Sequence, residues 1–177
     1  MQDADLFLEL AGIAGVFVGF GALIAVRSGG PSDPFEIAPM RAMVALGMMA
    51  VIAAVAPVTL DRYGLRGHEV WALSSSVVLA AWLVMLVINV QTPEYRQGWS
   101  TTLADEHARG LRVVDVVGDG AYVLYMILSV LTPIVIILGL APDLEAALYF
   151  TVVVLVLLGA AWTLLWLVYM ERRPARV

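Results

Sequence analysis

The sequence predicts an all-α integral membrane bundle with five transmembrane helices in a single domain, residues 1–177. Of the 177 residues, 62% are hydrophobic and 14% are charged, against roughly 45–50% and about 25% in ordinary soluble domains. Five stretches of the chain carry almost no charge and reach the roughly 20 residues that a helix needs to cross the hydrocarbon core. They are apolar on all sides, so helices rather than barrel strands must satisfy the backbone in lipid.

The first predicted helix covers residues 6–26 and contains one ionisable residue, Glu9. Asp3 and Asp5 precede it where a signal peptide would carry basic residues, so we interpret it as a retained helix. The other four predicted helices cover residues 42–60, 70–90, 121–140 and 146–170.

Arginine distribution predicts the orientation. All ten basic residues are Arg, and an odd number of spans places the two termini on opposite sides. Only Arg62 and Arg66 fall on the side of the N-terminus. Because basic residues concentrate on the cytoplasmic side, we expect the N-terminus outside and the C-terminus in the cytoplasm. The acidic excess of the chain then lies outside.

The loop between the third and fourth spans contains a predicted amphipathic segment, residues 101–112, at the cytoplasmic surface. Leu103 and Leu111 would face lipid, while Asp105 and Arg109 would face water. An acidic pair beside a histidine in this loop could form a corner of a metal site. Consecutive helical residues point in different directions, however, so a solvated face is the favoured interpretation.

Several functional classes have no support in the sequence. With no cysteine and a net charge of −5, the chain has no thiolate ligand or nucleophile and no basic surface for nucleic acid. His68 and His107 fall on opposite sides of the predicted bilayer. Nucleotide-binding and hydrolase motifs are absent. We therefore expect no catalytic residues, no metal and no cofactor, and a protein that is not an enzyme.

Small residues form a seam along the first predicted helix. Ala11, Gly15 and Gly19 repeat every four positions, and Gly12 and Ala22 extend the same pattern. Such spacing lets a second helix approach to backbone contact, where van der Waals packing drives association in lipid. The seam is therefore interpreted as a subunit interface, a pore-lining surface or a packing surface inside the monomer.

Three polar features lie inside the spans, and the first two are pore or ion-site candidates. Glu9 is either part of an ion site or an interfacial carboxylate that reaches headgroup water. Ser74 and Ser75, near the outer end of the third helix, can bridge helices or line a pore. Trp82 lies in the middle of the same helix, where its indole N–H needs a partner or a wet cavity.

Prolines predict breaks in two helices. Pro57 removes a backbone bond and frees the carbonyl of Ala53, and Pro133 does the same for Ser129. Neighbouring groups, hydroxyls or water must satisfy these carbonyls, and hydroxyls near Pro133 are placed to do so. Two glycines at the start of the fourth helix are further hinge candidates, although a simple helix start explains them as well. The full set of hinge candidates is Pro57, Gly118, Gly120 and Pro133.

The first half of the chain resembles a known group. The carrying segments are Phe17-Val-Gly-Phe-Gly-Ala-Leu-Ile-Ala-Val26, Ala56-Pro57, Tyr63-Gly-Leu and Val70-Trp-Ala-Leu-Ser-Ser75. They resemble small, uncharacterised bacterial multi-spanning inner-membrane proteins. The resemblance implies a location in the bacterial inner membrane and carries no activity or ligand.

Two functional hypotheses follow. Five helices are few for an alternating-access transporter, and the arginine bias opposes an antiparallel dimer. A parallel symmetric oligomer needs only one orientation and a self-complementary surface. The leading hypothesis is a homo-oligomeric cation channel or pore with Glu9 in an outer ring. The alternative is a non-catalytic accessory or scaffold subunit of a larger membrane complex. The expected partners are membrane lipid and further copies of the chain.

Overall fold

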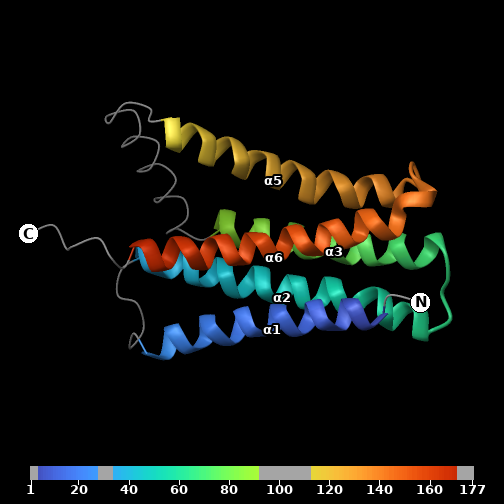
Figure 1. The fold of residues 1–177 in the computed structure, drawn as a ribbon, viewed down its shortest axis with the longest axis horizontal. Helices are drawn as coiled ribbons and strands as arrows, with labels where there is room; N and C mark the ends of the chain where they lie inside the picture. Colours follow the sequence, from blue (N-terminus) through green and yellow to red (C-terminus); the bar gives the residue numbers. More distant parts are fainter. Residues whose placement is uncertain (1–3, 28–33, 92–112, 171–177) are drawn as a thin grey trace, which may run out of the picture.

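The computed structural model describes residues 4–27, 34–91 and 113–170. Within these ranges all regular secondary structure is helical, as the sequence predicts, with five long helices and one short 3-10 helix (Figure 1). The elements are α1 (Ala4–Arg27), α2 (Pro34–Arg62), α3 (His68–Gln91), α5 (Val113–Ile137), η1 (Pro142–Leu144) and α6 (Glu145–Met170).

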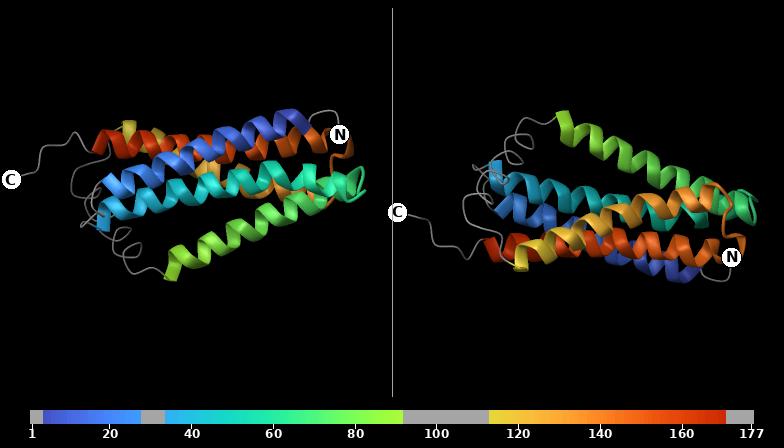
Figure 2. Two further views of the ribbon diagram at one scale, coloured as in Figure 1. Left: turned by 90° about the horizontal axis from the view of Figure 1, so that it is seen from below. Right: turned by 90° about the horizontal axis from the view of Figure 1, so that it is seen from above.

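Successive long helices run in opposite directions along one axis, so α1, α3 and α6 begin at the same end of the bundle (Figures 1 and 2). The helix α2 packs against α1, α3 and α6, while α5 packs against α3 and α6. In Figure 1, α1 and α5 therefore lie at opposite edges. Figure 2 shows α3 diverging from α2 toward the end where α3 finishes.

Among the described residues, four helices are long and apolar enough to cross a membrane. The qualifying stretches are Ala4–Ile24, Met40–Arg62, His68–Ile88 and Pro142–Leu165. The remaining predicted span is present as α5, whose described apolar stretch, Val123–Ile137, is shorter. Length and composition thus support a multi-pass membrane protein.

Helix boundaries agree with the sequence for α1, α3 and α6 and differ for the other two. The structure starts α2 at Pro34 instead of residue 42, and proline is favoured in the first turn because its missing N–H has no intrahelical acceptor there. It starts α5 at Val113 instead of residue 121 and ends it at Ile137 instead of residue 140. The predicted amphipathic segment 101–112 lies outside the described residues.

Glycines in the left-handed conformation end α2 and α5. Gly139 has φ of +63°, its N–H donates to the Ile136 carbonyl, and the N–H of Leu140 donates to the Val135 carbonyl. This pair of bonds is a Schellman motif, which satisfies the last carbonyls of a helix. The same arrangement follows α2 at Gly64, with φ of +88°. Both turns are short, so they hold the connected helices side by side.

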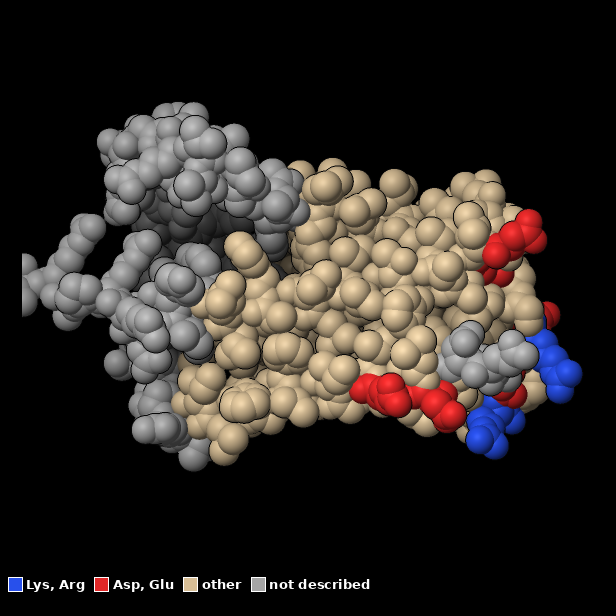
Figure 3. Space-filling model, in the orientation of Figure 1, with Lys and Arg blue, Asp and Glu red and all other residues tan. Residues whose placement is uncertain are grey.

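The outer surface of the bundle is apolar along most of its length. Leu23, Leu83 and Leu138 are each more than 60% exposed. In Figure 3, the coloured charged side chains on the visible face all lie in the half of the molecule where α1 begins, and most of the described surface between them is uncharged. An apolar exposed belt of this kind suits contact with lipid or with other membrane helices.

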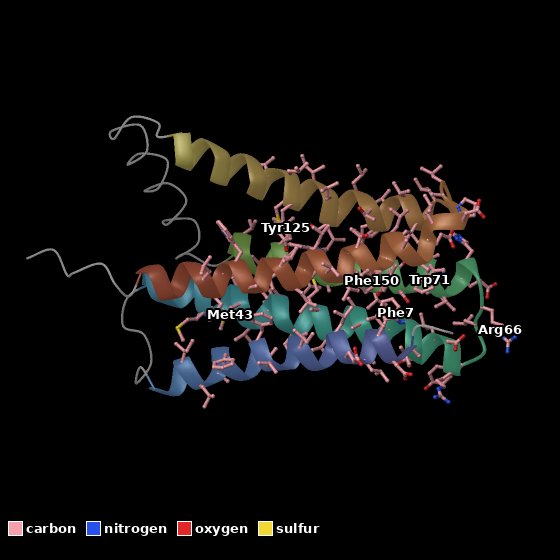
Figure 4. All side chains as sticks on the ribbon, in the orientation of Figure 1. Phe7, Met43, Arg66, Trp71, Tyr125 and Phe150 are labelled. Atoms are coloured by element: carbon pink, nitrogen blue, oxygen red, sulfur yellow. The ribbon has the colours of Figure 1, made fainter. Side chains whose placement is uncertain are left out.

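Aromatic rings form the packed core at the end where α1, α3 and α6 begin. Phe7 on α1 lies 6.1 Å from Trp71 on α3 and 6.0 Å from Tyr149 on α6, measured between ring centroids. Phe150 packs edge-on against Phe7 (Figure 4). Because one ring from α1 contacts both α3 and α6, this cluster fixes three helices at one level of the bundle.

Candidate functional site

Glu9 lies on the exposed side of α1. The residues of α1 that enter the core are Phe7 and Ala14, which are 2% and 0% exposed. Glu9 therefore points away from the interior of the bundle. A single copy of the chain cannot form an ion site that includes Glu9 inside its own helix bundle. An exposed carboxylate near one end of a span is available to headgroup water or to a neighbouring molecule.

The small-residue seam also faces outward. A β-carbon placed on Gly12, Gly15 or Gly19 would meet no atom within 4 Å. Ala22 is exposed as well, whereas Ala11 is half-buried and packs against the core, so it does not belong to the outward-facing part of the seam. Packing inside the monomer was one interpretation of the seam, and for these three glycines it is wrong. The seam forms part of the outer face of α1, which contains Glu9 as well.

Two other glycines provide the close packing between α1 and α2. A β-carbon on Gly21 would lie 2.7 Å from Val44 Cγ2, and one on Gly47 would lie 2.8 Å from Val18 Cγ2. The sequence analysis did not assign either glycine to this contact. A signal existed for Gly21, since it lies nine residues from Gly12, about two and a half helical turns, and therefore on the opposite side of α1.

Ser74 and Ser75 are fully buried on α3. Within the described part of the chain, neither hydroxyl has a hydrogen-bond partner. Ser76, the next residue, is exposed and donates to the Ala72 carbonyl at 2.8 Å. The two buried serines thus bring their hydroxyls into the interior of the bundle. They do not share a site with Glu9, which is exposed on α1.

Trp82 continues the polar side of α3. Its side chain is 6% exposed, and among the described residues its indole nitrogen has no hydrogen-bond partner. It packs edge-on against Tyr125 of α5 with ring centroids 6.5 Å apart. Because Ser74, Ser75, Val78 and Trp82 are all buried, one face of α3 brings two hydroxyls and one N–H into the interior.

The hinge candidates differ in their surroundings. Pro57 is buried, and the carbonyl it frees, that of Ala53, accepts a 2.7 Å hydrogen bond from the Tyr149 hydroxyl. Pro133 is also buried within α5. The Ser129 hydroxyl beside it donates to the Tyr125 or Met126 carbonyl, and not to the carbonyl that Pro133 frees. Of the two hydroxyls expected to compensate for Pro133, those of Ser129 and Thr132, the Ser129 hydroxyl therefore does not bond to that carbonyl.

The two glycine hinge candidates, Gly118 and Gly120, lie inside α5. The predicted helix start at residue 121, next to these glycines, is wrong. The helix begins earlier, at Val113, so any bending at these glycines would occur within a helix.

A pair of titratable residues joins the starts of α3 and α6. His68 Nδ1 and Glu145 Oε1 are 2.5 Å apart. Glu145 is 4% exposed, and the His68 ring also covers Gly139 in the turn after α5. This pair was not predicted from the sequence. Its only sequence signal is that both residues come just before predicted spans, at residues 70 and 146, on the same predicted side of the membrane.

Metal binding has no geometric support within the described residues, where no three His, Cys, Asp or Glu side chains gather. Comparison with protein families, curated proteins and solved structures finds no match to this chain. The arrangement itself must therefore support any functional proposal. Its distinctive features are an outward face of α1 with small residues and a carboxylate, and a core with buried polar groups on α3.

Proposed function

We propose that the protein is a homo-oligomeric cation channel or pore of the bacterial inner membrane, assembled through the outer face of α1. The observation that carries the proposal is that Gly12, Gly15 and Gly19 have open space where a β-carbon would lie. A second α1 helix can approach that surface to backbone contact. Around a symmetry axis, repeated contacts of this type form a closed ring.

Charge at one end of the bundle supports the choice of a cation. Glu9 precedes Gly12 by three residues, so both belong to one side of α1, and both are exposed. In a ring of α1 helices, one Glu9 from each subunit would lie near the mouth. A ring of carboxylates raises the local concentration of cations and favours their entry.

The proposed orientation has the N-terminus outside. It rests on the arginine distribution, in which only Arg62 and Arg66 lie on the side of the N-terminus. The acidic residues at that end include Asp5, Glu69 and Asp143. The mouth of the pore that carries Glu9 would therefore face the outside and be acidic.

Single-channel recording tests this function. Purified protein in a planar bilayer should conduct cations in preference to anions, and Glu9→Gln should lower the cation-to-anion permeability ratio. Asp143→Asn is the matched control, because Asp143 lies in η1, outside α1, and should change selectivity less. Absence of current from the folded oligomer, or unchanged selectivity in Glu9→Gln, contradicts the proposal.

The alternative is a non-catalytic accessory or scaffold subunit. The same open surface on α1 would accept a helix of a different membrane protein equally well. Crosslinking in native membranes from a cysteine introduced at Gly15 separates the two functions. Crosslinks between copies of this chain favour the channel, whereas crosslinks only to other proteins favour the accessory subunit.

A further inference from the structure

A shallow apolar groove runs along the outer surface of α2 beside α3. Its volume is about 380 Å³. Val77 forms its α3 wall, and its α2 wall consists of Val51, Ile52, Val55, Ala56, Thr59 and Leu60. The one hydroxyl in these walls, that of Thr59, donates to the Val55 carbonyl at 3.0 Å. This hydroxyl proton is therefore not available to a ligand, and the walls of the groove present apolar side chains to it.

Arg62 stands at the end of this groove. Ile52, Val55, Thr59 and Arg62 follow one another at spacings of three, four and three residues, which places them along one side of α2. Arg62 is exposed in the last turn of the helix. Tyr63 comes next and is 82% exposed, as aromatic residues often are at the membrane–water interface.

The length of the groove matches one leaflet of a bilayer. Ten residues separate Ile52 from Arg62, and at about 1.5 Å per residue they rise about 15 Å. This is half of a hydrocarbon core of about 30 Å. With Arg62 at the level of the headgroups, the groove reaches the middle of the bilayer.

We propose that this groove binds one anionic phospholipid, with an acyl chain along α2 and the phosphate on Arg62. The planar guanidinium can donate two parallel hydrogen bonds to phosphate oxygens, which gives this contact both strength and direction. Asp61 is half-buried and lies about 100° around the helix from Arg62. The charged residue on the groove side at the end of α2 is therefore Arg62, which is positive. This binding site is independent of α1 and of the proposed pore.

Native mass spectrometry of the delipidated full-length protein, titrated with dioleoyl phosphatidylglycerol in a neutral detergent, tests the proposal. The wild type should bind one lipid molecule more tightly than the rest. Arg62→Gln should weaken that site about fivefold, the effect of one basic residue on an anionic lipid. Arg66→Gln is the matched control, because Arg66 is exposed in the α2–α3 turn and does not lie on the groove side of α2. This variant should weaken lipid binding at the site by less than twofold.

A second variant tests the acyl chain. Ala56→Phe places a large side chain in a groove wall that is only half-buried, so the protein should fold, as shown by unchanged helical circular dichroism. The tight site should disappear. Equal effects of Arg62→Gln and Arg66→Gln overturn the proposal, as does a folded Ala56→Phe that retains the tight site. A folded Ala56→Phe that changes the oligomeric mass and leaves lipid binding intact identifies the groove as a protein contact and also overturns it.

Discussion

The hydroxyl of Tyr149 on α6 donates a 2.7 Å hydrogen bond to the carbonyl oxygen of Ala53 on α2. That carbonyl lies four residues before Pro57, which has no N–H to offer it. A proline in one helix is thus compensated by a tyrosine from another. Since both groups are buried, the bond ties α2 to α6 in the interior, beside the aromatic cluster near the start of α6.

Replacing Tyr149 by Phe should lower the free energy of unfolding by about 1–3 kcal/mol, because a buried carbonyl would lose its partner. The measurement is an unfolding titration with SDS in mixed micelles. Pro57→Ala supplies the control, since alanine restores an N–H for the Ala53 carbonyl. In that background the same tyrosine change should cost clearly less. An equal cost in both backgrounds contradicts the compensation.

His68→Ala should destabilise the bundle by about 1–2 kcal/mol, because it leaves the Glu145 carboxylate buried without its partner. The effect is smaller than for a fully buried pair, since His68 is half-exposed. Combining His68→Ala with Glu145→Gln removes the unpaired charge and should recover part of the loss. The same SDS unfolding titration measures the free energy of unfolding of both variants. A double variant less stable than His68→Ala would contradict a stabilising role of His68 for the Glu145 carboxylate.

Ser75→Ala should leave stability unchanged or raise it by about 1 kcal/mol. The variant removes a fully buried hydroxyl that has no hydrogen-bond partner among the described residues, and burying such a group is costly. Ser76→Ala, at an exposed position, should have little effect. A loss of more than about 1 kcal/mol from Ser75→Ala alone would mean that the hydroxyl has a partner that stabilises the fold.

Gly47→Val should weaken the packing of α1 on α2. A β-carbon at Gly47 would already lie 2.8 Å from Val18 Cγ2 and 3.4 Å from the Ala14 carbonyl oxygen. We expect a loss of about 1–3 kcal/mol, typical of overpacking. Gly12→Val has open space and should leave the stability of the monomer nearly unchanged. Equal losses in the two variants, determined by thermal unfolding of monomeric protein, would contradict the assigned packing.

The sequence predicts most of the fold because hydropathy and helix punctuation act locally. The bounds of α1, α3 and α6 lie within two residues of the prediction. The start of α5 was missed because Asp115, Gly118, Asp119 and Gly120 lower the local hydropathy. Hydropathy locates the start of the apolar stretch, which follows these residues. The helix itself begins before that stretch.

The candidate site was less predictable because it depends on which helices are neighbours. Pro57 identifies a carbonyl that needs a donor, but Tyr149 is 96 residues away from Ala53 along the chain. Likewise, α1 has small residues on opposite sides, at Gly12 and Gly21. Helical spacing separates these two sides, and only the position of α2 determines which side stays open.

The mass of the detergent-solubilised protein, compared between wild type and Gly15→Ile, tests most directly whether α1 assembles the protein. If α1 assembles the protein, the wild type should be a closed oligomer. Gly15→Ile should be a folded monomer, since isoleucine would fill an open outer surface without disturbing the bundle. Leu83→Ile, at an exposed position on α3, introduces the same side chain away from α1 and should keep the oligomer. A monomeric wild type, or an oligomer unaffected by Gly15→Ile, would contradict assembly through α1.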